Sequence, residues 1–156
     1  MNLAFQRDDF WRRLSDHERR FFARGLAVSE SSAARSIKVP GADHPITIER
    51  NPRRVVVRVA GQIVADSRAA LDLRESSYPV VRYIPRSDVN MALLQRTEHH
   101  TYCPYKGDCS YFSIAPGGER SINAVWSYES PYSAVASIKD HLAFYPTRVD
   151  SIEEID

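Results

Sequence analysis

The spacing of apolar residues changes along the chain, and the change occurs near residue 37. Before it, apolar side chains recur at helical spacing, which predicts an amphipathic helix over residues 8–24. At helical spacing, Leu3, Phe10, Leu14, His17 and Phe21 fall on one side of this N-terminal stretch. Such a face is typical of a helix that packs on a domain or on a second copy of the chain. We therefore expect a helical extension and linker over residues 1–36, followed by a domain over residues 37–156.

After residue 37, apolar residues alternate with polar ones or form short runs that end at proline or glycine. This pattern predicts β-strands at residues 55–59, 63–65, 80–84, 110–115, 121–128 and 142–145. Tight turns are expected at Gly61-Gln62, with glycine first, and at residues 116–119. Helical spacing appears only at residues 88–94, with Ser87 as N-cap, and at residues 132–141. The acidic tail, residues 151–156, is expected to fray. The fold class is therefore mainly β, a small antiparallel domain with a few short helices.

Composition limits the number of domains, the classes of partner and the cellular location that we expect. The 156 residues suit one domain with an appendage. A formal net charge of +1 does not favour nucleic acid or an anionic membrane as a partner. No apolar run approaches the roughly 20 residues that span a bilayer, and the first residues lack the pattern of a secretory signal. With only two cysteines, the sequence predicts a cytoplasmic protein.

Reactive side chains gather between residues 99 and 112. His99, His100, Cys103 and Cys109 are ligand types that zinc uses, but five residues separate the cysteines and no second pair follows. We therefore expect neither a metal nor a cofactor. Lys106, three residues after Cys103, would lower the pKa of that thiol if the two side chains met. The alternative is that Cys103 packs as a small apolar residue.

Aromatic residues suggest a binding cleft. Seven of them lie in or beside the expected strands: Tyr83, Tyr105, Tyr111, Phe112, Trp126, Tyr128 and Phe144. A small β-domain seldom buries so many phenols, because each buried hydroxyl needs a hydrogen-bond partner. A half-open cleft meets that need with water or a ligand. Its polar groups would come from Glu75, Asp88, His100 and Lys106.

Several blocks of the sequence, read together, resemble a known family. They are residues 40–46, 78–89, 101–107 (Thr-Tyr-Cys-Pro-Tyr-Lys-Gly), 124–128 and 141–145. The chain from about residue 37 to residue 153 is similar to the bacterial and fungal family known as domain of unknown function 427, which is also labelled nucleotidyltransferase-like. The resemblance implies a mainly-β fold of the β-tent type and no established activity. Its motif residues match Glu75, Tyr83, Asp88, Cys103, Lys106, Gly107, Trp126 and Tyr128. The paired aspartates that a magnesium-dependent nucleotidyltransferase needs are not found in the sequence.

The leading hypothesis is a domain that binds a small polar or aromatic metabolite. Its ligand-binding residues would be Glu75, Tyr83, Asp88, Tyr105, Lys106, Trp126 and Tyr128. An alternative is a thiol enzyme or redox protein that uses Cys103 with Lys106. A further alternative is an interaction module, in which the N-terminal helix forms a homodimer. The sequence does not decide between an enzyme and a binding module.

Overall fold

The structure is a computed structural model, and it describes residues 35–156. The predicted helix over residues 8–24 and the dimer contact assigned to it lie outside the described residues. In the part that is described, no helix has both the length and the apolar composition needed to cross a bilayer.

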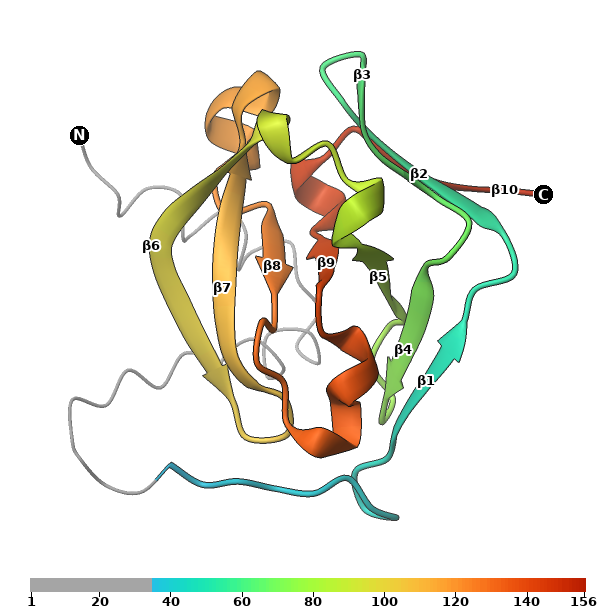
Figure 1. The fold of residues 1–156 in the computed structure, drawn as a ribbon, viewed down its shortest axis with the longest axis vertical. Helices are drawn as coiled ribbons and strands as arrows, with labels where there is room; N and C mark the ends of the chain where they lie inside the picture. Colours follow the sequence, from blue (N-terminus) through green and yellow to red (C-terminus); the bar gives the residue numbers. More distant parts are fainter. Residues whose placement is uncertain (1–34) are drawn as a thin grey trace.

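The larger of two sheets holds seven antiparallel strands in the order β1-β4-β5-β9-β8-β7-β6. The strands are β1 Ile46–Arg50, β4 Leu71–Glu75, β5 Val81–Pro85, β6 Leu94–Cys103, β7 Gly107–Ile114, β8 Val125–Ser127 and β9 His141–Phe144. The sheet is bent, with β1 and β6 as its two edges (Figure 1). The segment that precedes β1 runs across one end of the sheet, below the turn between β6 and β7 (Figure 1).

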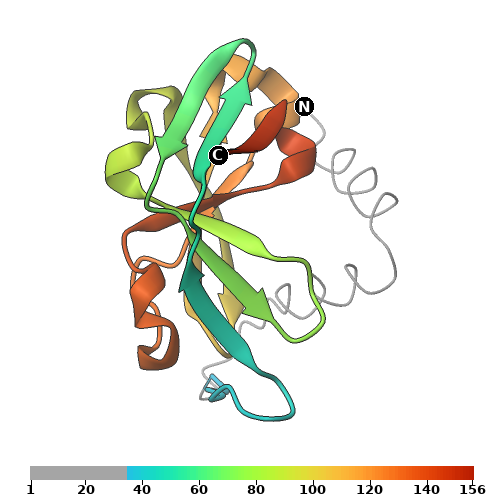
Figure 2. The same cartoon turned by 90° about the vertical axis from the view of Figure 1, so that its right-hand side faces the viewer.

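The smaller sheet has the order β10-β2-β3 and is also antiparallel. Its strands are β2 Arg54–Val59, β3 Gln62–Ser67 and β10 Ser151–Ile155. Within residues 35–156, five short 3-10 helices connect the strands: η1 Arg86–Asp88, η2 Met91–Leu93, η3 Ala115–Ser121, η4 Ser133–Ile138 and η5 Pro146–Arg148. Seen from the side, the β2–β3 hairpin and β1 lie at opposite ends of the molecule (Figure 2). The predicted fold class, mainly β with a few short helices, is confirmed.

Two clusters of buried side chains form the core. The first joins both sheets and contains Val55, Val57 and Val59 of β2, where every second residue points inward. The second is richer in phenols and thiols, and it consists of Leu73, Tyr83, Cys109, Tyr111, Tyr128, Val135, Ile138 and Ala143. The aromatic residues that the sequence assigns to a cleft therefore supply much of the core.

The hairpin between β2 and β3 turns one residue earlier than predicted. Val59 pairs with Gln62, so the two turn residues are Ala60 and Gly61. Their φ angles are 49° and 74°, which is the left-handed geometry of a type I′ turn. The right-handed twist of the two strands suits a type I′ turn.

The two predicted helical segments are shorter than expected. Residues 88–94 split into η1 and η2 because the backbone of Val89 pairs with Ala65 of β3. Pro85, not Ser87, precedes η1, and no side chain caps it. Residues 132–141 hold η4, which breaks at Val135, where φ is −123°, and the first residue of β9.

The predicted strand over residues 121–128 shrinks to β8, because η3 extends to Ser121. The prediction that residues 151–156 fray is wrong. Residues 151–155 form β10, in which Ile152 pairs with Val57 of β2 and packs on the first core cluster. Ile152 covers apolar residues of the first core cluster, and this contact explains why the acidic tail is ordered.

Candidate functional site

The turn between β6 and β7 places a lysine inside the protein. The Lys106 N–H donates to the Cys103 carbonyl at 3.2 Å, and Pro104 occupies the second position of this turn, which suits its fixed φ. Gly107 follows with a φ of 105°, a conformation that residues with a Cβ rarely adopt. Tyr132 then donates its N–H to the Lys106 carbonyl at 3.1 Å. These local constraints direct the Lys106 side chain inward, where it is 3% exposed.

The ammonium of Lys106 meets the carboxylate of Glu75, which is itself 5% exposed. Glu75 ends β4, next to the edge strand β1, whereas Lys106 follows β6 at the other edge of the sheet. The ion pair therefore connects regions at opposite sides of the bent sheet. The ring of Tyr128 lies beside it, with its centroid 5.9 Å from Nζ. A buried charge of this kind persists only when its partner is held in place.

His44 binds the other oxygen of the same carboxylate. Its Nε2 lies 2.8 Å from Oε1 of Glu75, while Lys106 binds Oε2. An ionised carboxylate only accepts hydrogen bonds, so Nε2 carries the proton. In the neutral imidazole, Nδ1 then presents a lone pair. No hydrogen bond to Nδ1 is found within residues 35–156.

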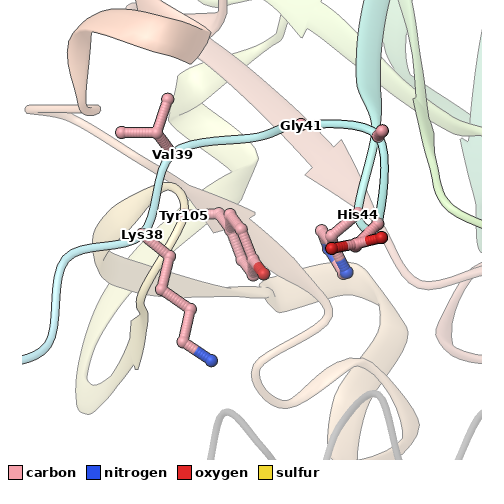
Figure 3. Close-up of a pocket in the computed structure, with 7 residues that line it drawn as sticks. Lys38, Val39, Gly41, His44 and Tyr105 are labelled. Atoms are coloured by element: carbon pink, nitrogen blue, oxygen red, sulfur yellow. The ribbon is translucent and has the colours of Figure 1, made fainter.

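The imidazole of His44 stacks on the ring of Tyr105. The two centroids are 4.1 Å apart and the planes differ by 9°. The Lys38 ammonium lies 5.9 Å from the Tyr105 centroid, and the Tyr105 ring stands between the Lys38 and His44 side chains (Figure 3). These side chains border a hollow of about 340 Å³, lined by Lys38, Val39, Gly41, Ala42, Asp43, His44 and Tyr105.

Backbone contacts fix the segment that forms one wall of the hollow. Gly41 and His44 exchange two hydrogen bonds, at 3.2 and 3.1 Å, around a tight turn. Lys38 donates its N–H to the Pro104 carbonyl at 2.9 Å, and Tyr102 donates its hydroxyl to the Ser36 carbonyl at 2.8 Å. The wall is therefore tied to the hairpin that carries Tyr105.

Comparison with known proteins identifies the domain around this site. Residues 47–155 match the model of a family described as Domain of unknown function (DUF427), which is also named NTP_transf_9. The chain belongs to the DUF427 family. No curated protein matches the chain significantly. Of the residues that line the hollow, only Tyr105 lies inside the DUF427 match, and the others precede it.

The structure brings together some of the site residues that were predicted for this DUF427 domain. Glu75 and Lys106 form an ion pair, and Tyr105 lines the hollow next to them. Tyr83 and Tyr128 lie in the core with 1% and 7% of their surface exposed, and burial raises both pKa values well above the ordinary range. They are absent from the lining of the hollow, so contact between these rings and a ligand stays a prediction.

Trp126 and Asp88, which were also predicted to bind the ligand, contact residues outside the hollow. The Trp126 indole is half-buried, donates its N–H to the Tyr83 hydroxyl at 3.3 Å and lies 4.5 Å from the Tyr145 ring. The Asp88 carboxylate accepts a hydrogen bond of 2.6 Å from Ser67, which ends β3 in the smaller sheet. Neither residue lines the hollow.

The two cysteines differ in environment. Cys103 is half-buried, whereas Cys109 is buried, and burial raises the pKa of the Cys109 thiol to about 12. Glu75 binds the ammonium of Lys106 that the sequence offered as a partner for the Cys103 thiol. No group of three His, Cys, Asp or Glu side chains among residues 35–156 is arranged to hold a metal ion.

Sequence reasoning missed Lys38, Asp43 and His44. It used residues 40–46 as one block of the family resemblance and gave them no role in a site. The link between His44 and Glu75 arises because Ile46 of β1 pairs with Glu75 of β4, and neither strand was predicted. A histidine two residues before that pair therefore reaches a carboxylate 31 positions away in the sequence.

Proposed function

We propose that this DUF427 domain binds a small polar or aromatic metabolite in the hollow beside Tyr105 and His44. The observation that carries the proposal is the stacked pair of the Tyr105 and His44 rings at the edge of the hollow. The buried Glu75 binds the His44 ring, and Lys106 binds Glu75. The hollow, about 340 Å³, lies in the range of roughly 300–1,000 Å³ that small-molecule sites occupy. Flat apolar rings with a few fixed polar groups are the usual lining of such sites.

The rigidity of the site supports binding in particular. Glu75 fixes both the position and the tautomer of the His44 imidazole, and Lys106 holds Glu75. A group that is already ordered loses little conformational freedom when a ligand arrives, so more of the contact energy appears as affinity. A surface histidine without such support would lack this advantage.

Saturation-transfer NMR on the full chain tests the proposal. The probes are small ring compounds of different charge: benzamide, nicotinamide, indole, benzamidine and benzoate. We expect at least one of them to bind at millimolar concentration or tighter, because Tyr105 offers a ring to stack on. Tyr105→Leu is expected to weaken that binding at least fivefold.

Tyr132→Leu is the matched control. Tyr132 is also partly exposed and does not line the hollow, and its hydroxyl meets the Tyr102 hydroxyl and not the wall of the hollow. Its replacement is expected to leave affinity within twofold of the original value. Equal losses in both variants, or no binding by any of the five probes, would overturn the proposed function.

A further inference from the structure

The hollow offers a hydrogen-bond acceptor to a ligand. Asp43 lines it with an exposed carboxylate, and no ion pair to Asp43 is found within residues 35–156. A carboxylate only accepts hydrogen bonds. It therefore favours a ligand that carries N–H donors.

The Tyr105 ring already interacts with a cation. The Lys38 ammonium lies 5.9 Å from its centroid, which is within the range of a cation–π contact. Lys38 is exposed, and its side chain stands on the other side of the ring from His44 (Figure 3). A flexible lysine that rests on a ring at the edge of the hollow can move aside and leave that face to a ligand.

From these observations we propose that the hollow selects a small organic cation with N–H donors, such as an amidinium or guanidinium compound. This inference rests on the proposed function and names its ligand class. The cation takes the place of the Lys38 ammonium over Tyr105. Its N–H groups donate hydrogen bonds to the Asp43 carboxylate, which lines the same hollow. Lys38 is thus an internal competitor for the site.

Three probes of nearly the same shape test the charge preference. Benzamidine is cationic, benzamide is neutral and benzoate is anionic at pH 7.5. Affinities are measured by titration of amide NMR signals of the full chain, followed at residues 38, 39, 41–44 and 105. We expect benzamidine to bind at least fivefold more tightly than benzamide, and benzoate to bind most weakly.

Charge-removing variants test the role of each lining residue. Lys38→Gln is expected to tighten benzamidine binding at least threefold, because it removes both the competitor and the repulsion. Asp43→Asn is expected to weaken benzamidine binding at least threefold. Both changes should be at least twofold larger for benzamidine than for benzamide, because only benzamidine carries the positive charge. Lys139→Gln, which removes an exposed lysine far along the chain, controls for the change in net charge.

The outcomes separate this inference from the proposed function. If benzamide or benzoate perturbs residues 38–44 and 105 as strongly as benzamidine does, the hollow binds ligands but the preference for cations is wrong. Weaker benzamidine binding in Lys38→Gln would also overturn the inference. If none of the three probes perturbs these residues, this inference fails, and the proposed function fails with it when indole and nicotinamide leave the residues unperturbed as well.

Discussion

Lys106 and Glu75 form an ion pair that connects the turn after edge strand β6 with the end of β4 on the other side of the sheet. Both side chains are almost fully buried. The second oxygen of Glu75 holds His44, which stacks on Tyr105. The interior charge pair and the hollow at the surface therefore form one connected arrangement, and a change to either charge should affect both stability and the site.

Replacement of Lys106 by methionine should destabilise the protein strongly. The change leaves Glu75 as a buried carboxylate with one partner fewer, which typically costs about 3–5 kcal/mol. Denaturant unfolding measures the loss. The double variant Lys106→Met/Glu75→Gln should recover part of it, because the uncompensated charge is then gone.

An exposed ion pair provides the control for this experiment. Arg58 and Glu153 are 3.8 Å apart, and each side chain is more than 40% exposed. Glu153→Gln should change the free energy of unfolding by less than about 1 kcal/mol. If Lys106→Met costs no more than Glu153→Gln, the buried pair does not hold the sheet as described.

Two isoleucines of β10, one packed on the core and one exposed, test whether this strand is ordered. Ile152 packs on the first core cluster, whereas Ile155 is 37% exposed. Ile152→Asp should cost roughly 2–4 kcal/mol, because it places a carboxylate against apolar side chains. Ile155→Asp should cost less than about 1 kcal/mol. Thermal unfolding compares them, and equal small effects would indicate a frayed tail.

The ion pair of Arg96 and Glu129 predicts that the free energy of unfolding decreases at acid pH. The hydrogen bond that Glu129 accepts from Arg96 lowers the pKa of the Glu129 carboxyl from 4.5 to about 2. The folded form therefore binds this proton less readily than the unfolded form. The stabilisation is complete above pH 4.5 and is lost as the pH falls from 4.5 through 2.

The Glu129 contribution should be small, because the Arg96 and Glu129 side chains are 48% and 40% exposed. We expect at most about 1 kcal/mol. The measurement is the difference in unfolding free energy between the wild type and Glu129→Gln from pH 7 to pH 2. A difference that stays constant down to pH 2 would contradict the lowered pKa.

The cysteines should react at very different rates with iodoacetamide. Only the thiolate reacts, and a pKa of about 12 leaves roughly one Cys109 thiol in ten thousand ionised at pH 8. Cys103 is also less buried. Peptide mass spectrometry should therefore find Cys103 modified first, and Cys103→Ser should remain almost unlabelled. Rapid labelling of Cys109 would show that the phenol-rich core cluster opens.

The sequence predicted those strands in which a local pattern agrees with the final packing. The alternating valines of β2 and the apolar runs of β5 and β9 are examples, and each lies where a strand was expected. Strands β1, β4 and β6 were missed, because their exposed or charged residues weaken the local pattern. Their pairing depends on neighbours that are distant in the sequence, so tertiary context decides it.

The site was also predicted only where a local signal exists in the sequence. Lys106, Glu75 and Tyr105 were predicted as residues, but their arrangement was not. The Tyr83 and Tyr128 rings were expected to form walls, yet each lies in the core, where Tyr83 receives a hydrogen bond from Trp126. His44 was missed because its contact with Glu75 requires the register of β1 against β4. A long-range register of this kind leaves no local signal in the sequence.

The location of a bound ring compound on the protein decides whether the hollow is a binding site. The measurement is a set of intermolecular nuclear Overhauser effects between benzamidine or benzamide and the isotope-labelled full chain. We predict that the probe protons give these effects to the Tyr105 ring and to residues 38–44, which line the hollow. Effects confined to other parts of the protein, or none from either probe at millimolar concentration, would contradict a binding site in the hollow.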